Sequence, residues 1–410
     1  MQRNSELNNM ENNTFEALYT SFHRKMAKIS LDYKRYLYER INWNVRMLGI
    51  KGARGVGKTT LLLQRIKSVF ANTDTVFYTS LDDLWFKTNS LQELVEYLYT
   101  HGVTHLFLDE VHHYPDWSQN LKNIYDNYPD LNIVYTGSSM LEIDNSKVDL
   151  SRRQTIYELP GLSFREFLAF EGVMSIEPVS LAELVSEHLK IALKITARVK
   201  IIPLFEKYLQ YGYYPFYKDA GEDFGTRLKE IASLVIDSDL PAVETVEYGT
   251  VQKAKKMLMI LAERVPFTPN ISQLCKELET KRDLGLKLLY ALDKAALLNL
   301  LTSEIKSYKQ LSKPDKIYLN NSNLMYALTP QTNKGNVRET FFFNQMNTVL
   351  PIVMPKYGDF LVNEKYLFEV GGKNKTFDQI KDLSDSYLAV DDIEFGHKNR
   401  IPLWMFGLLY

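Results

Sequence analysis

The chain has 410 residues, of which 45% are hydrophobic and 24% are charged. This composition is typical of an ordinary folded protein and excludes wholesale disorder, collagen-like repeats and a coiled coil. The 49 Lys and Arg residues and 50 Asp and Glu residues give a net charge of −1, so the chain as a whole is not an evident polyanion-binding protein. The length predicts roughly two to four domains.

The charge is unevenly distributed along the chain. Residues 251–320 contain 13 Lys and Arg but only 7 Asp and Glu, a balance of +6, and the remaining residues sum to −7. The single Cys275 excludes an intrachain disulfide framework and a thiolate zinc cluster, and we expect it to be a small buried helix residue. No apolar run reaches the roughly 18–20 residues needed to cross a bilayer. The polar start lacks the apolar core of a secretory signal. We therefore expect a cytoplasmic protein without membrane contact.

Strand and helix alternate in the first part of the chain. The first 30 residues are rich in Asn and lack strong periodicity, and a helical segment follows at 32–41. Apolar or β-branched strands are predicted at 46–51, 75–80, 104–108 and 132–136, and helices at 58–70, 92–99 and 117–128. This alternation predicts a parallel sheet with helices on both faces.

Beyond residue 160 the patterns become mainly helical. Helices are predicted at 180–200 and 202–210, followed by a turn packed by aromatic side chains at 211–217. Three helices at 251–265, 271–279 and 284–301, trailed by strand-like segments at 299–302 and 316–319, fit a winged helix-turn-helix. The last part mixes a helix at 338–350 with strands at 359–362, 366–370 and 402–406.

A glycine-rich loop joins the first strand to the next helix. Its residues fit the phosphate-binding pattern G-x-x-x-x-G-K-[ST] in full: Gly52, Ala53, Arg54, Gly55, Val56, Gly57, Lys58 and Thr59. Glycines let successive N–H groups point at phosphate oxygens, and the helix N-terminus adds partial positive charge. Lys58 is expected to reach the β- and γ-phosphates, Thr59 to ligate Mg²⁺ and Thr60 to donate to the α-phosphate.

The third predicted strand ends in two carboxylates, Asp109 and Glu110. Its apolar run fits a central strand buried on both faces, which would place Asp109 beside the glycine-rich loop. We expect Asp109 to hold Mg²⁺ through water and Glu110 to polarise the attacking water. The alternative is an acidic pair that is merely solvated at the start of a loop.

Other polar residues are weaker candidates. Thr136 and Ser138, at the end of the fourth strand, are expected either to sense a γ-phosphate or to form a simple turn. Arg153 or its neighbour Arg152 is expected either to act as an arginine finger in trans or to pair with surface acids. The adjacent His112 and His113 lack i, i+4 spacing and a third ligand, so we interpret them as local hydrogen-bonding residues. The chain has no guanine-reading N-K-x-D motif, which favours ATP over GTP.

In order, the segments GARGVGKTTLL, LFLDEVHHYPDWSQNLKNIYD, IVYTGSSM and ELPGLSFREFLAF resemble the prokaryotic AAA+-like ATPases. The segment LSFREF at 162–167 and the aromatic segment YLQYGYYPFY at 208–217 add to the resemblance, and Arg153 matches the family's arginine before ELPGLSF. Arg152 stands where the family usually carries Gly. The resemblance implies a P-loop domain, a winged helix and a C-terminal domain similar to restriction endonucleases.

The resemblance also implies a nuclease pattern of an early Glu, a strand Asp and then Glu-x-Lys. Glu339, Asp359 and Glu369 fit this pattern, but Gly371 stands where the lysine belongs, and Lys373 and Lys375 are the nearby cations. Because that lysine positions water beside a metal, we expect the C-terminal domain to be inactive as a nuclease.

The sequence thus predicts an α/β P-loop, AAA+-like parallel sheet followed by a helical, winged-helix domain and a small α+β domain. The predicted divisions are an N-terminal extension at 1–30, an ATPase domain at 31–175, a helical domain at 176–325 and a nuclease-like domain at 326–410. We expect Mg²⁺-dependent ATP hydrolysis in a homo-oligomer, coupled to DNA through 251–320 or to a protein partner. The alternatives are a slow nucleotide-controlled switch and an ATPase fused to a nuclease.

Overall fold

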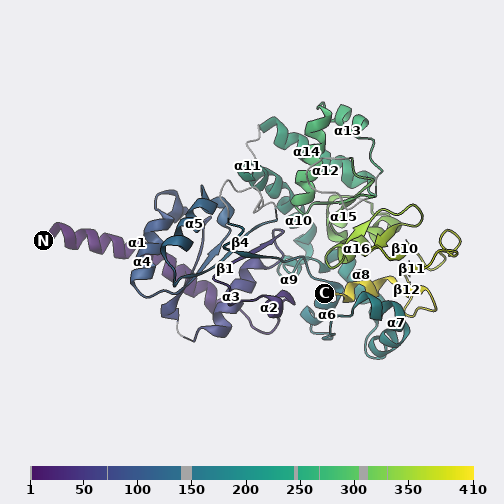
Figure 1. Cartoon of the computed structure of the whole chain (residues 1–410), viewed down its shortest axis with the longest axis horizontal. Helices are drawn as coiled ribbons and strands as arrows, with labels where there is room; N and C mark the ends of the chain where they lie inside the picture. Colours follow the sequence, from purple (N-terminus) through teal and green to yellow (C-terminus); the bar gives the residue numbers. More distant parts are fainter. Residues whose placement is uncertain are drawn as a thin grey trace. The chain divides into compact units, whose positions relative to one another are not determined.

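The computed structural model of the chain forms two compact units, unit 1 (Met1–Leu159) and unit 2 (Pro160–Tyr410) (Figure 1). Each unit has its own hydrophobic core. The predicted boundaries at residues 175 and 325 lie inside unit 2 and stay predictions. The structure describes residues 2–71, 73–139, 150–243, 248–266, 268–303, 313–329 and 331–410.

Unit 1 is built on a five-stranded parallel sheet with the strand order β2-β3-β4-β1-β5. The strands are β1 (Met47–Gly52), β2 (Val76–Ser80), β3 (His105–Asp109), β4 (Asn132–Ser138) and β5 (Thr155–Glu158). The helices are α1 (Gln2–Lys28), α2 (Leu37–Arg40), α3 (Lys58–Val69), α4 (Leu91–Thr100) and α5 (Trp117–Asn127). The predicted P-loop NTPase sheet is confirmed, and the sequence missed only the short edge strand β5.

The strand order explains the layers of unit 1. From β1 the chain crosses over β4 and β3 to reach β2, and it then returns through β3 to β4. Because such crossovers are right-handed, α3 lies on one face of the sheet and α4 and α5 lie on the other (Figure 1). The order also places β3 and β4 inside the sheet, and both strands are almost entirely buried.

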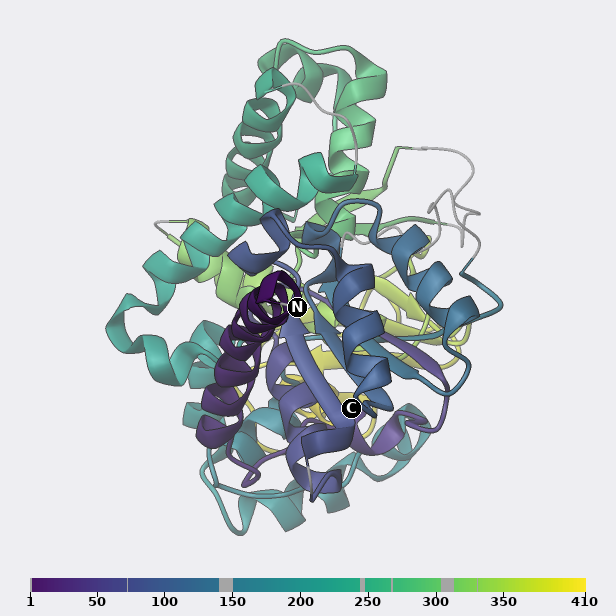
Figure 2. The ribbon, with the colours of Figure 1, turned by 90° about the vertical axis from the view of Figure 1, so that its left-hand side faces the viewer.

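Helix α1 is a feature that the weak periodicity of the first 30 residues did not predict. It packs against α3 and β2 (Figure 2). Leu18 and Phe22 are buried, and Tyr19 makes an edge contact with Phe77 of β2. The spacing of Leu18 and Phe22 places both on one helix face, which is the face that tertiary packing stabilises.

Unit 2 combines helices with two antiparallel or mixed sheets. Its helices are α6 (Phe164–Phe170), α7 (Leu181–Thr196), α8 (Ile201–Lys207), α9 (Tyr217–Ala220), α10 (Phe224–Leu234), α11 (Leu240–Val243), α12 (Tyr248–Arg264), α13 (Ile271–Glu277), α14 (Arg282–Lys294), α15 (Ser322–Leu328) and α16 (Lys334–Asn347). A two-stranded antiparallel sheet joins β6 (Leu298–Leu301) to β7 (Lys316–Leu319). A mixed sheet has the order β12-β11-β10-β9-β8, formed by β8 (Ile352–Val353), β9 (Phe360–Val362), β10 (Tyr366–Gly371), β11 (Ser386–Val390) and β12 (Arg400–Pro402). Within the described ranges, no helix is both long and apolar enough to cross a membrane.

The aromatic segment 208–217 packs in the interior of unit 2. It begins with a π-helical turn, Tyr208–Gly212, that continues α8. The buried Asn323 side chain donates to the Tyr208 and Leu209 carbonyls and accepts from Tyr213 N. One amide side chain therefore satisfies backbone groups that the irregular turn leaves unpaired.

Two predictions for unit 2 need correction. The predicted strand at 402–406 is wrong, because β12 ends at Pro402 and a 3₁₀ helix covers Leu403–Leu408. The predicted helix at 284–301 ends at Lys294, because Ala296 takes a left-handed conformation and the chain turns into β6. Cys275 is a buried helix residue, as expected, and its sulfur packs over Gly285.

Candidate functional site

The glycine-rich loop lies between the end of β1 and the start of α3. Gly55 and Gly57 have φ angles of 87° and 98°, a left-handed conformation that favours glycine. At Gly52 the limit is space, because a Cβ atom would lie 2.4 Å from the carbonyl oxygen of Leu159. The glycines of the predicted motif thus shape the loop that ends at the N-terminus of α3.

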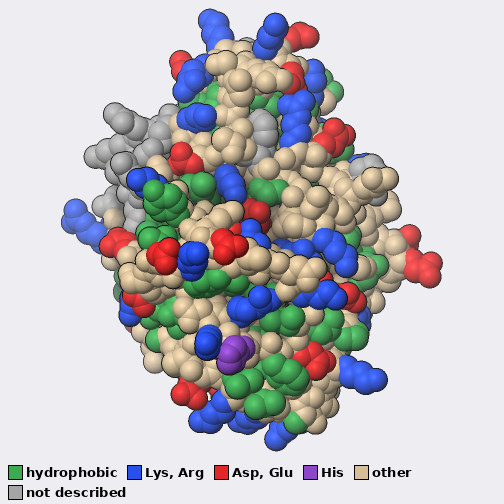
Figure 3. All heavy atoms as spheres, turned by 90° about the vertical axis from the view of Figure 1, so that its right-hand side faces the viewer, with side chains coloured by type: hydrophobic (Ala, Val, Ile, Leu, Met, Phe, Trp, Pro, Cys, Tyr) green, Lys and Arg blue, Asp and Glu red, His purple; other side chains and the backbone are tan. Residues whose placement is uncertain are grey.

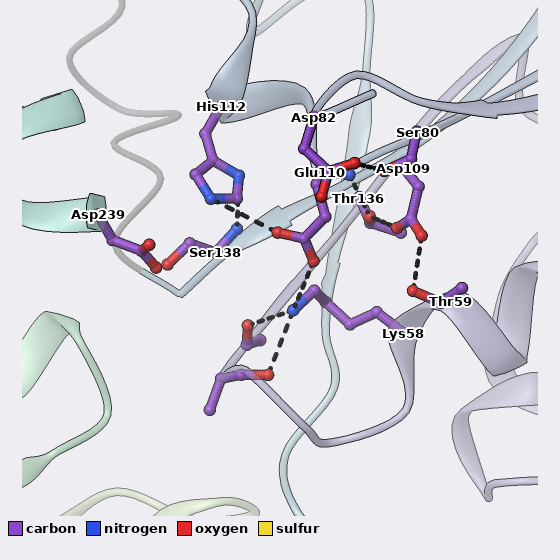
Figure 4. A network of polar contacts seen from close by, with 12 residues as sticks. Lys58, Thr59, Ser80, Asp82, Asp109, Glu110, His112, Thr136, Ser138 and Asp239 are labelled. Atoms are coloured by element: carbon purple, nitrogen blue, oxygen red, sulfur yellow. Dashed lines mark hydrogen bonds and ion pairs between the residues drawn. The ribbon is translucent and has the colours of Figure 1, made fainter. Parts of the chain in front are cut away.

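Lys58 is buried and folds back over this loop (Figure 4). Its ammonium donates to the carbonyls of Gly52 at 2.9 Å and Ala53 at 3.2 Å, and it lies 3.6 Å from Oε1 of Glu110. The charge is therefore balanced by protein oxygens, for which phosphate oxygens can substitute.

Two arginines belong to the loop environment. Nη1 of Arg35 donates to the Val56 carbonyl at 2.6 Å, and the Arg35 side chain is buried. Sequence reasoning missed Arg35, because it lies 21 residues before its partner and in no motif. Nη1 of Arg54, inside the loop, is buried and makes no hydrogen bond among the described residues. A buried donor without an acceptor is costly, so a bound anion would stabilise it.

Asp109 is buried at the end of β3, where three hydroxyl groups donate to its carboxylate. Thr59 donates to Oδ2 at 2.6 Å, Tyr78 of β2 donates to the same oxygen at 2.9 Å, and Thr136 of β4 donates to Oδ1. Burial, and then the negative charge of Asp109, raise the pKa of Tyr78. Tyr78 was not among the predicted site residues.

The predicted metal ligands, Thr59 and Asp109, are thus in direct contact. Their donor set consists of a hydroxyl and a carboxylate oxygen, which are the hard ligands that Mg²⁺ prefers. The residues present therefore fit the predicted metal.

Glu110 has a left-handed backbone, with φ of 51°. Such a conformation is strained for a residue other than glycine, and strain of this kind concentrates at functional sites. The Glu110 N–H donates to the hydroxyl of Thr136 at 3.0 Å, so the fully buried Thr136 connects the Asp109 carboxylate to the Glu110 backbone. The second oxygen of the Glu110 carboxylate, Oε2, lies 3.5 Å from Nε2 of His112.

Ser138 lies at the end of β4, next to this cluster (Figure 4). Its peptide N–H donates to Nδ1 of His112 at 3.4 Å. The structure therefore brings together Lys58, Thr59, Asp109 and Glu110 with both predicted residues of β4, Thr136 and Ser138.

Arg153 is held at a different place in unit 1. Its guanidinium forms a two-point ion pair with Asp126 near the end of α5, with N–O distances of 2.9 and 3.0 Å. The hydrogen bond from Arg153 lowers the pKa of Asp126. This pairing matches the alternative role predicted for Arg153, in which it binds a surface acid.

A second cluster of charged side chains lies in unit 2. Lys316 of β7 bridges Glu339 of α16 at 3.2 Å and Asp359 at 3.7 Å. Burial, and then the charge of Asp359, raise the pKa of Glu339. The nearly inaccessible Glu369 of β10 pairs through Oε1 with Lys375 at 2.6 Å.

Gly371 explains how Lys375 reaches Glu369. A Cβ atom at position 371 would lie 2.7 Å from Cβ of Lys375, so only glycine leaves room for this side chain to pass. The glycine that takes the place of the expected lysine thus accompanies a lysine supplied from four positions further along the chain.

Comparison with known proteins supports the fold of unit 1. Residues 44–168 match the family model of the AAA domain. An uncharacterized protein of Methanocaldococcus jannaschii is 27% identical over 318 residues, which cover 71% of this chain and 66% of that protein. The match thus spans just under two thirds of the relative's own length.

Among solved structures, AMPPCP-bound DnaA from Aquifex aeolicus aligns with 63% of this chain and 84% of its own, at 16% identity and a TM-score of 0.28. Domain III of DnaA from Thermotoga maritima aligns with 42% of this chain and 91% of its own, at 20% identity and a TM-score of 0.26. TM-scores this low do not establish a structural relationship to either protein.

Proposed function

We propose that unit 1 binds ATP with Mg²⁺ and hydrolyses it. The observation that carries this proposal is the meeting of Lys58 and Thr59 with Asp109 and Glu110 at the carboxyl ends of β1 and β3. Open α/β sheets bind ligands at this edge. The match of residues 44–168 to the AAA domain supports an ATP-binding domain.

Each residue has a defined task in the proposed reaction. The loop N–H groups and the N-terminus of α3 hold the phosphates, and Lys58 leaves the Gly52 and Ala53 carbonyls to contact them. Thr59 and Asp109 would hold Mg²⁺, which neutralises charge on the β- and γ-phosphate oxygens when bound. Glu110 orients the attacking water and accepts its proton.

The test is to compare two variants in separate assays of binding and turnover. Glu110→Gln should retain ATP binding and lose steady-state hydrolysis, because an amide cannot accept the proton. In Asp109→Asn, ATP binding should depend less on Mg²⁺ than it does in wild type. Asp130→Asn, an exposed site in the same unit, serves as the control. Equal turnover of wild type and Glu110→Gln would refute the hydrolytic assignment.

We further propose that hydrolysis drives changes in a DNA or protein partner. The basic segment 251–320 motivates the DNA alternative, since DNA binding needs clustered cations. Several of these cations already have partners inside unit 2: Lys253 and Lys256 donate to backbone carbonyls, and Arg264 pairs with Glu277. At the end that carries α13 and α14, acidic side chains stand among the cationic ones (Figure 3).

The Arg264–Glu277 ion pair neutralises one cation of the segment, whereas Lys253 and Lys256 keep their positive charge, so DNA stays a candidate beside a protein partner. The described part of 251–320 contains α12, α13 and α14 followed by β6 and β7, an order that supports the proposed winged helix. Gel shifts on a DNA duplex at low and high salt test the DNA alternative. No shift at low salt would remove DNA as the partner.

A slow nucleotide-controlled switch is a further candidate, favoured by the pairing of Arg153 with Asp126. This pair withholds the predicted finger unless a second subunit or a partner releases it. Turnover per subunit that rises with protein concentration in wild type and not in Arg153→Ala would identify Arg153 as a finger acting in trans, and Arg152→Ala tests the neighbouring candidate. A concentration-independent turnover, unchanged in Arg153→Ala, would leave the switch and remove the finger.

The contact between Lys375 and Glu369 favours a second, distinct activity, metal-dependent phosphodiester cleavage in unit 2. Against it, the Lys316 ammonium stands between Glu339 and Asp359, where a divalent cation would have to enter. Nicking of plasmid DNA with Mg²⁺ or Mn²⁺ that is lost in both Glu369→Ala and Lys375→Ala would support cleavage. Intact plasmid with every metal would establish the predicted inactivity.

A further inference from the structure

His112 is a buried side chain that connects the end of β4 to Glu110 (Figure 4). Its Nδ1 accepts the Ser138 N–H at 3.4 Å, and its Nε2 lies 3.5 Å from Oε2 of Glu110. A neutral imidazole has one nitrogen that accepts and one that donates. Because Nδ1 faces a donor, a neutral His112 carries its proton on Nε2, which lies 3.5 Å from Oε2 of Glu110 in a contact that does not meet hydrogen-bond geometry.

This tautomer argues against a metal centre at the same residues. The candidate ligand atoms of Glu110, His112 and His113 lie within 4.8 Å of one another, so the third ligand that the sequence did not reveal is present. A metal-binding histidine usually donates its other ring N–H to an acceptor, however, and here Nδ1 faces the Ser138 donor. If a metal bound to Nε2, the ring proton would lie on Nδ1, and the Nδ1–H group would then face the N–H group of Ser138.

We propose instead that His112 is a positioning residue for the Glu110 carboxylate, an inference that rests on the proposed ATP hydrolysis. The two carboxylate oxygens are divided between two neighbours, Oε1 toward Lys58 and Oε2 toward His112. When Lys58 moves to the phosphates, the carboxylate closes on Nε2 of His112 through Oε2, and Oε1 is left open on the side of the phosphate-binding loop. That oxygen is then the one that accepts the proton from water.

The same arrangement makes the end of β4 a control point for hydrolysis. The Ser138 peptide group selects the tautomer of His112, and His112 sets the direction of the Glu110 carboxylate. A displacement of the end of β4 at Ser138 therefore changes the orientation of the Glu110 carboxylate through His112, without a direct contact between Ser138 and Glu110.

The test compares three substitutions of His112 in the full chain. In His112→Ala, kcat should fall about 10-fold to 100-fold, the loss typical of a misplaced catalytic group, with little change in the KM for ATP. His112→Gln should recover most of kcat, because its amide nitrogen lies near the position of Nε2. His112→Asn should not, because its amide nitrogen lies near Nδ1. His101→Ala, at the exposed end of α4, is the matched control.

Outcomes that overturn the proposal are a wild-type or raised kcat in His112→Ala, an equal loss in His112→Ala and His112→Gln, or a change confined to KM. A second readout does not depend on ATPase activity. The ¹⁵N shifts of labelled histidine, with the His112 signal assigned by its loss in His112→Ala, should show the Nε2–H tautomer at pH 8. The Nδ1–H tautomer would refute the proposal even in an active enzyme. Absent wild-type turnover with the expected tautomer would instead refute the proposed function.

Discussion

The hydroxyl of Thr136 gives the sharpest test of how the site is held together. It donates to the Asp109 carboxylate and accepts from the Glu110 N–H, and it is fully buried. Thr136→Val keeps the side-chain shape and removes both bonds. A hydrogen bond to a charged group contributes about 1.5–3 kcal/mol and a neutral one about 1 kcal/mol, so we expect a loss of about 2.5–4 kcal/mol.

For a unit of this size, about 1 kcal/mol corresponds to roughly 2–4 °C, so the Tm of unit 1 should fall by about 5–15 °C. Calorimetry of the full chain measures this change, and the transition that shifts on addition of ATP identifies unit 1. Thr136→Ser is the matched control, because it keeps the hydroxyl and loses only a methyl group, at a cost of about 1 kcal/mol.

Equal Tm values for Thr136→Val and Thr136→Ser would refute the linking role. If Thr136→Val instead kept the stability and lost turnover, its hydroxyl would act on the nucleotide, as the sequence predicted for a γ-phosphate sensor. The two roles of Thr136 are therefore separated by one pair of variants.

Two further substitutions test packing and charge. Gly52→Ala should lower the Tm of unit 1 and weaken ATP binding, because the new methyl group would lie 2.4 Å from the carbonyl oxygen of Leu159. The control is Gly225→Ala on α10, where the methyl group enters open space and should change neither quantity. Wild-type ATP affinity in Gly52→Ala would contradict this prediction. Burial, and then the charge of Asp359, raise the pKa of Glu339 above its ordinary value of 4.5, so the folded chain holds this proton more tightly than the unfolded chain does. The contribution of Glu339 to the free energy of unfolding therefore falls as the pH rises from 4.5 toward the folded pKa. Glu339→Gln should lack this decline in urea unfolding between pH 4 and 8, and a difference from wild type that does not vary with pH would contradict the assignment.

The core of the candidate site could be predicted because its signals are local in sequence. The glycines around Lys58 and the apolar run before Asp109 each describe one strand end, and a parallel sheet brings such ends together. Tyr78 and Arg35 could not be found in this way. Tyr78 looks like any aromatic strand residue, and only the adjacency of β2 and β3 aims its hydroxyl at Asp109.

Unit 2 shows a different limit of prediction. The Glu-x-Lys pattern has glycine at position 371, and the sequence offered Lys373 and Lys375 as nearby cations without indicating which of them reaches Glu369. The structure shows that the path of the chain after β10 returns Lys375 to this carboxylate. A spacing rule assumes a straight strand, so it does not describe a side chain that arrives after a turn.

The close packing of Gly52 against Leu159 also has a mechanical consequence. Leu159 is the last residue of unit 1, and its N–H donates to the Lys51 carbonyl at 2.8 Å, immediately before the phosphate-binding loop begins. The last residue of unit 1 is therefore held beside the first residue of that loop. We expect a rearrangement of the loop at Gly52 to displace Leu159, the residue whose peptide bond leads to Pro160.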